Sequence, residues 1–160
     1  FNVEDKCQFL VQDAEEGISI QQKFDYIICV QSLLYLDLNE TFSKLSKLLK
    51  DQGELIIIES VSGNYLFDLN RVKNTKNISL KFSSSLKKLH SKEIIKNTKR
   101  YFKILDEDYF GFTTTVSYLI ESKFKVSFLN KFFFGLDFLL KKNPLLRRYF
   151  FTMLIILKKV

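Results

Sequence analysis

The stretch from Phe24 to Ser60 constrains the fold of this chain more than any other. Its two apolar runs, 26–30 (YIICV) and 55–58 (LIII), show no alternation of apolar and polar residues. Such runs are typical of strands that are buried on both faces of a parallel sheet. Between them, leucine and phenylalanine recur at three- and four-residue spacing, which predicts an amphipathic helix. Because a strand, a helix and a second parallel strand form a right-handed crossover in nearly every known case, the sequence predicts an α/β layered domain.

The ends of this helix are marked in the sequence. Asp37 and Glu40 have the spacing of a capping box at its start. Gly53 offers the left-handed residue with which many helices end.

Three further segments are expected to join the sheet. The apolar run 7–12 precedes Asp13 as a strand precedes a loop. Residues 102–110 and 152–157 also have the composition of strands, and the second is expected to be the last strand of the domain. Before residue 102, Ser91 is expected to cap a helix with one apolar face.

Length and composition place the chain among single domains with a real core. A domain of about 150 residues buries roughly 70% of its unfolded surface, so this chain of 160 residues needs no disulfide scaffold. Cys7 and Cys29 both lie in apolar runs, and we expect reduced core thiols and a reducing, cytoplasmic setting. Residues 1–10 do not resemble a signal peptide, and the run 149–157 is far shorter than the ~20 residues of a membrane-spanning helix.

The net charge of +7 is concentrated near the C-terminus. Residues 121–151 hold seven basic and two acidic side chains, a net +5, together with eight of the seventeen phenylalanines. We interpret 111–151 as a helical insertion or lid within the single domain 1–160, interrupted at Pro144. Interleaved bases and aromatics would suit an anionic membrane surface or a nucleic acid, whereas the alternative is a cover that keeps its lysines in water.

The candidate site follows from the predicted topology. In open α/β sheets, ligands bind outside the carboxyl ends of the strands, near a topological switch point. The residues that follow the predicted strands in this region are Asp13, Ala14, Gln31, Ser32, Glu59 and Ser60.

The order of these segments resembles the C-terminal part of the class I S-adenosylmethionine (SAM) dependent methyltransferases. FDYIICVQSLLYL, at 24–36, is similar to the fourth strand of that family, and KDQGEL, at 50–55, is similar to the turn before its fifth strand. The resemblance implies a Rossmann-like three-layer sandwich with a mostly parallel sheet, a C-terminal antiparallel strand and missing N-terminal strands. No pattern in this chain matches the glycine-rich cofactor loop of the family, which is expected in two βα units that come before it.

The resemblance also implies SAM as the cofactor and four residues that contact it. Asp13 and Ala14 match the acidic and small pair after the third strand, where the aspartate accepts a hydrogen bond from the adenine amino group. Gln31 and Ser32 would border the methionine side of the cofactor. Gln31 and Tyr35 stand where glutamate and histidine are common in the family, which leaves the substrate open. The alternative to the adenine contact is that Asp13 only caps a loop.

The predicted function is SAM-dependent transfer of a methyl group to a small-molecule acceptor. Residues 61–89 and 113–118 are expected to shape the acceptor pocket. His90, the only histidine, is of the residue type that most often serves as a general base, although a capping or exposed role is the alternative. No catalytic residue is assigned and no metal site is expected. The rival hypotheses are a membrane-surface or nucleic-acid binding module and a non-catalytic methyltransferase homologue.

Overall fold

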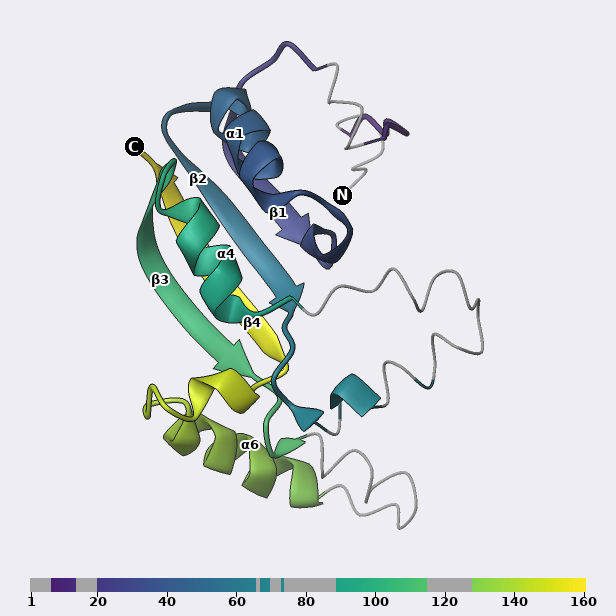
Figure 1. Ribbon diagram of the computed structural model, residues 1–160, viewed down its shortest axis with the longest axis vertical. Helices are drawn as coiled ribbons and strands as arrows, with labels where there is room; N and C mark the ends of the chain where they lie inside the picture. The colour runs from purple at the N-terminus through teal and green to yellow at the C-terminus, as the bar shows by residue number, and fades with distance from the viewer. Residues whose placement is uncertain (1–6, 14–19, 66, 70–72, 74–88, 115–127) are drawn as a thin grey trace.

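A mixed four-stranded sheet forms the centre of the molecule (Figure 1). The computed structural model describes residues 7–13, 20–65, 67–69, 73, 89–114 and 128–160. The strands are β1 (Phe24–Val30), β2 (Leu49–Ser60), β3 (Phe102–Phe110) and β4 (Thr152–Lys159), and they lie in the order β1-β2-β4-β3. β1 and β2 are parallel, while β4 is antiparallel to β2 and β3. The predicted parallel pair and the antiparallel C-terminal strand are therefore confirmed.

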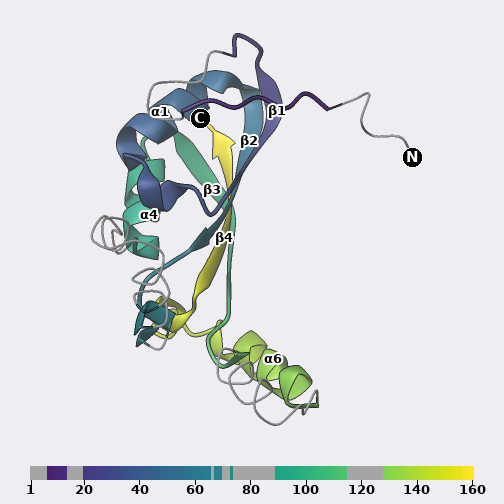
Figure 2. The same cartoon turned by 90° about the vertical axis from the view of Figure 1, so that its right-hand side faces the viewer.

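Among the described helices, α1 (Leu38–Leu48) and α4 (Ser91–Thr98) cover the same face of the sheet (Figure 2). The register explains which side chains they bury. Ile57 of β2 lies opposite Ile155 of β4, and both are fully buried under the helices. Their neighbours Ile56 and Ile156 also lie opposite each other but point to the other face and are only half-buried. One face of the sheet thus forms the core, and in the described part of the chain the other face is open.

The start of α1 is capped as expected, but its end differs from the prediction. The Asp37 side chain accepts a hydrogen bond from the Glu40 backbone N–H at 2.8 Å. α1 ends at Leu48 with Leu49 as an extended C-cap, so no left-handed residue ends the helix. Gly53 lies inside β2, where the left-handed residue is its neighbour Gln52, with φ 67°. Glycine is still favoured at 53, because an added Cβ would lie 3.0 Å from the Lys50 carbonyl oxygen and 3.1 Å from that of Asp25, which is closer than most Cβ contacts. A close backbone approach, and not a positive φ, favours this glycine.

The boundaries of α4 also differ from the prediction. The N-cap is His90, and Ser91 is the first helical residue. Ser91 therefore lies one position after the N-cap, and its side chain interacts with Tyr109 of β3. α4 ends at Thr98, and Phe102 already belongs to β3.

The predicted strand at 7–12 is not formed. Residues 7–13 have no regular structure, and Phe9 and Val11 are 90% and 104% exposed. Cys7 is exposed as well, which contradicts its predicted place in the core, whereas Cys29 is partly buried in β1. An apolar run becomes a strand only when it finds a partner strand and a covering layer, and the run 7–12 has neither among the described residues.

The basic C-terminal segment contains one described helix, α6 (Phe128–Leu140), followed by turns and the 3₁₀ turn η3 (Arg147–Tyr149). α6 ends before Pro144, as predicted. It lies beyond the carboxyl end of β3, away from α1 and α4 (Figures 1 and 2). No described helix is long and apolar enough to cross a membrane.

Candidate functional site

The carboxyl ends of β1 and β2 meet at one edge of the sheet. Directly after β1, Gln31 adopts a left-handed backbone with φ 49°. Its backbone N–H donates to the Ile58 carbonyl oxygen at 2.9 Å, and its side-chain amide lies 3.5 Å from the Ser60 hydroxyl. A non-glycine residue at positive φ is strained, and such strain is concentrated at functional sites. The chain therefore turns sharply at the point where the sheet topology predicts a ligand.

Glu59 organises the loop that follows this turn. Its side chain is 2% exposed, and its two carboxylate oxygens accept hydrogen bonds from the backbone N–H groups of Leu33, at 2.8 Å, and Ser60, at 3.0 Å. Leu33 starts the 3₁₀ turn η2 (Leu33–Tyr35). Hydrogen bonds from backbone N–H groups to a carboxylate are short and strong. Glu59 thus fastens η2 to the end of β2 and fixes the position of Gln31 and Ser32.

The same carboxylate affects a neighbouring thiol. Burial in the first place, and then the charge of Glu59, raise the pKa of Cys29 from 9.0 to about 11. Cys29 is therefore a protonated thiol at neutral pH and a poor nucleophile.

The predicted site residues fall into two groups. Gln31, Ser32, Glu59 and Ser60 are brought together at the strand ends. Asp13 lies in the exposed segment 7–13, which forms no strand. Ala14 lies outside the described residues. The role of Asp13 and Ala14 in cofactor binding stays a prediction.

The acceptor-pocket segments 61–89 and 113–118 are described only at 61–65, 67–69, 73, 89 and 113–114. Sequence reasoning placed Glu59 at the end of its strand but did not predict the hydrogen bond that it accepts from the Leu33 backbone N–H. That bond joins residues 26 positions apart, so no local pattern encodes it.

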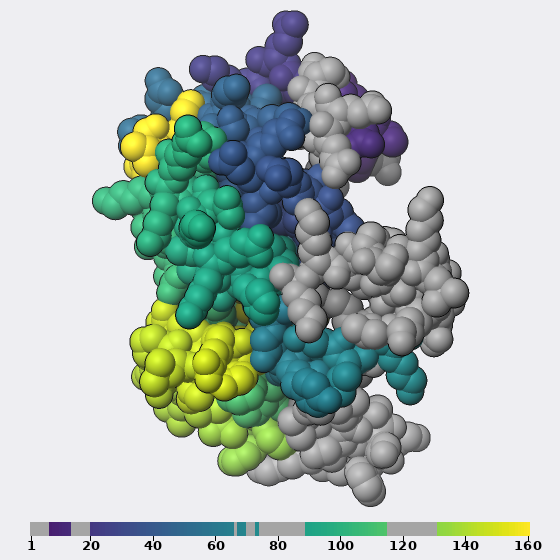
Figure 3. Space-filling model, viewed as in Figure 1, coloured from purple at the N-terminus to yellow at the C-terminus, as the bar shows by residue number. Residues whose placement is uncertain are grey.

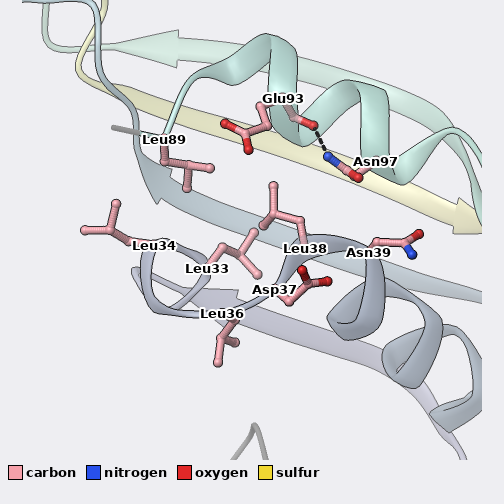
Figure 4. A pocket seen from close by; sticks show the side chains of 9 residues that line it. All are labelled: Leu33, Leu34, Leu36, Asp37, Leu38, Asn39, Leu89, Glu93 and Asn97. Carbon is pink, nitrogen blue, oxygen red and sulfur yellow. Dashed lines mark hydrogen bonds between the residues drawn. The ribbon is translucent and has the colours of Figure 1, made fainter. Parts of the chain in front are cut away.

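A hollow of about 130 Å³ lies between η2, the start of α1 and α4 (Figure 4). On the α4 side of the hollow, the Asn97 side-chain amide donates to the Glu93 backbone carbonyl oxygen at 2.9 Å. The lining residues are Leu33, Leu34, Leu36, Asp37, Leu38, Asn39, Leu89, Glu93 and Asn97. Sites for drug-sized ligands occupy about 300–1,000 Å³, so this hollow is too small for a nucleoside cofactor. Gln31 and Ser32 do not line it.

A second hollow, of about 240 Å³, lies where β2 ends and α4 begins. His90 lines it together with Ser62, and the His90 Nδ1 lies 3.2 Å from the Ser62 carbonyl oxygen. A carbonyl only accepts, so this contact places the proton of a neutral ring on Nδ1 and leaves Nε2 as the basic nitrogen. The capping position of His90 is observed, and its role as a base stays a prediction.

Comparison with known proteins identifies the family. A family model described as a methyltransferase domain matches residues 2–120. The chain belongs to this methyltransferase family. A comparison with curated proteins gives no significant match.

Solved structures share the methyltransferase fold at low sequence identity. The PH0226 protein from Pyrococcus horikoshii is 17% identical, with a TM-score of 0.55 over 99% of this chain and 63% of its own length. The geranyl diphosphate C-methyltransferase from Streptomyces coelicolor, solved with Mg²⁺, geranyl diphosphate and S-adenosyl-L-homocysteine, is 14% identical, with a TM-score of 0.54 over 89% of this chain and 51% of its own length. The cyclopropane synthase MmaA2 from Mycobacterium tuberculosis is 12% identical, with a TM-score of 0.51 over 88% of this chain and 57% of its own length. The methyltransferase chain described here thus spans between half and two thirds of these relatives.

Proposed function

We propose that the whole protein transfers a methyl group from SAM to a small-molecule acceptor at the carboxyl edge of β1 and β2. The observation that carries the proposal is the sharp turn at Gln31, held against Ser60 and fastened by Glu59, in a chain of the methyltransferase family. The complex of the Streptomyces coelicolor enzyme with S-adenosyl-L-homocysteine supports the choice of cofactor by analogy.

The residues at this edge suit one end of the cofactor. Gln31 offers an amide with two donors and one acceptor, while Ser32 and Ser60 offer hydroxyl groups. This set matches the ammonium and carboxylate groups of the methionine end. Asp13 would accept from the adenine amino group at the other end.

The described hollows of 130 and 240 Å³ are smaller than such a cofactor needs. In this proposal the remaining contacts come from further elements of the whole protein, which would also cover the open face of the sheet.

Bound SAM would supply an electrophilic methyl group on a sulfonium sulfur. The chain itself contributes geometry, because aligning two reactants is the main source of acceleration in such a reaction. Glu59 acts here as a positioning residue, since it fixes η2 and through it Gln31 and Ser32. If the reaction needs a proton acceptor, His90, which lines the second hollow, would serve as that acceptor.

Calorimetric titration with SAM and with S-adenosylhomocysteine tests the proposal. The whole protein should bind both ligands, and Asp13→Ala and Gln31→Ala should each weaken binding about tenfold or more, as expected for the loss of a hydrogen bond to a charged or strongly polar group. Asp25→Ala is the matched control, because Asp25 is exposed, pairs with Lys50 and lies at the opposite end of β1.

Equal affinities for the Asp13, Gln31 and Asp25 variants would refute the assignment of the site. A whole protein that binds neither ligand would refute the cofactor.

A further inference from the structure

A buried acid, Asp137, ties α6 to the segment that leaves β3. Asp137 is 5% exposed, and its carboxylate accepts hydrogen bonds from the backbone and hydroxyl groups of Thr113 and Thr114 at 2.6–3.3 Å. It also accepts from the Phe112 backbone N–H at 3.1 Å. These bonds tie the helix to the chain that leaves β3. They fix which side of α6 faces the protein.

Ion pairs near the end of α6 reinforce this orientation. Lys141 pairs with Asp108 of β3 at 2.7 Å, and Arg147 pairs with Glu107. The basic side chains on the protein side of the segment are thus neutralised by β3.

The outer side of α6 is apolar and basic. Its exposed side chains are Phe132 (59%), Phe134 (62%), Phe138 (52%) and Leu139 (62%), together with Lys131 and Lys142. At about 100° per residue, Lys131 falls among the exposed aromatic and leucine side chains and away from Asp137, while Lys142 lies in the turn directly after the helix. Neither lysine forms an ion pair within the described ranges, and the Lys142 ammonium lies 5.2 Å from the Phe138 ring. Figure 3 shows α6, in yellow-green, and the segment that follows it, in yellow, at the surface of one end of the molecule.

The charge and apolar content of this outer face distinguish three possible binding partners, namely a second copy of the chain, a nucleic acid and a lipid bilayer. A second copy of the chain would enclose the lysines of both copies in one apolar contact, and the only acid of α6, Asp137, is buried and does not pair with them, which opposes a symmetric contact. Nucleic-acid interfaces are polar and strongly basic, whereas this face has four large apolar side chains for two lysines. Phenylalanine and leucine with lysines that snorkel between them are typical of helices that lie in the headgroup region of an anionic bilayer.

We propose that the outer face of α6 docks this protein on an anionic lipid bilayer. The helix has 13 residues, so it lies on the surface and does not span the membrane. α6 lies at the same sheet edge as Gln31 and Ser60, because β3 is parallel to β1 and β2. Docking therefore keeps that edge near the lipid surface. The inference depends on α6 alone and not on the proposed methyl transfer.

Vesicle co-sedimentation of the 160-residue chain tests this proposal. Vesicles of phosphatidylcholine with roughly a third phosphatidylserine should bind the chain, and pure phosphatidylcholine should bind it at least about tenfold more weakly. Lys131→Gln/Lys142→Gln and Phe134→Ser/Phe138→Ser should each reduce binding to the anionic vesicles about tenfold or more.

Two control variants match these changes elsewhere on the surface. Lys92→Gln/Lys99→Gln removes two exposed lysines from the α4 region, and Phe9→Ser/Val11→Ser removes two exposed apolar side chains from the segment 7–13. Both should bind as the unchanged chain does. Far-ultraviolet circular dichroism and thermal unfolding establish that each variant is folded before it is compared.

Four outcomes would overturn the proposal. They are no binding to anionic vesicles, equal loss in the control variants, an α6-dependent dimer in size-exclusion chromatography, and tighter binding to polyuridylic acid than to vesicles with a steep salt dependence.

Discussion

The two faces of the sheet carry similar side chains but have different surroundings. On the face under α1 and α4, Leu55, Ile57 and Ile155 are 0% exposed. On the other face, Tyr26, Ile28 and Val30 of β1 are 63%, 62% and 56% exposed. The unbroken apolar runs in the sequence predict burial on both faces, and the described helices provide it on one. The stability of this chain should therefore depend mainly on the covered face.

The largest expected effect comes from truncating the covered face. Ile57→Ala should lower the free energy of unfolding by about 2–5 kcal/mol, because it leaves a cavity in a closely packed core. The matched change one residue away, Ile56→Ala, lies on the open face and should cost less than half as much. Urea unfolding followed by circular dichroism measures both. Equal losses would show that the two faces are equally covered in solution.

The thiol of Cys29 provides a pH-dependent test of the covered face. Its pKa of about 11 in the folded chain exceeds the ordinary value of 9.0, so above pH 9 the unfolded chain releases this proton more readily. The contribution of the Cys29 thiol to the free energy of unfolding is therefore fully present below pH 9. It is lost as the pH rises from 9 through about 11, by up to about 2–3 kcal/mol.

The difference in unfolding free energy between the unchanged chain and Cys29→Ala isolates this loss from other titrating groups. A difference that stays constant from pH 8 to about 11 would contradict the raised pKa.

A third test compares two glutamates of β2. Glu59→Gln keeps the size of the side chain but replaces one of the two acceptors of the Leu33 and Ser60 N–H groups with a donor, so it should cost about 1–2 kcal/mol. Glu54→Gln, on the open face opposite Tyr26, should cost less than about 0.5 kcal/mol. Hydrogen exchange should also show faster exchange of the Leu33 amide in Glu59→Gln alone. Unchanged protection there would exclude Glu59 as the residue that holds η2.

The smallest expected effect on stability is on the open face itself. Ile28→Thr keeps a β-branched side chain and should change the free energy of unfolding by less than about 0.5 kcal/mol. It should at the same time reduce the binding of the hydrophobic dye ANS, because it removes exposed apolar surface. A loss comparable to that of Ile57→Ala would mean that this face is packed against something in the isolated chain.

Much of the fold follows from local patterns in the sequence. The strands at 102–110 and 152–157, the helix before β2 and its Asp37 cap are all found where composition and spacing predict them. The end of α6 before Pro144 is found as well. These features depend on residues within a few positions of one another, so the sequence displays them directly.

The errors share a different physical origin. Residues 7–12 have the composition of a strand but lack a partner in the described structure. Ser91 has the side chain of a cap but lies one position after the N-cap, His90. Of the candidate site, Gln31 and Ser32 are placed at a strand end as predicted, whereas Asp13 is not. Composition alone does not settle these differences, because a strand needs a partner and a helix start depends on the backbone of its first turn.

By itself, the sequence determined the parallel crossover and the Asp37 cap of its helix, because apolar period and capping chemistry act over a few residues. The family followed from the resemblance of segments 24–36 and 50–55 to known methyltransferases, and the family model confirms it. The tertiary structure alone decided that Glu59 fastens η2, that Gln52 and not Gly53 is left-handed, and that Asp137 turns the apolar side of α6 outward. These outcomes depend on hydrogen bonds and close contacts between segments that only folding brings together.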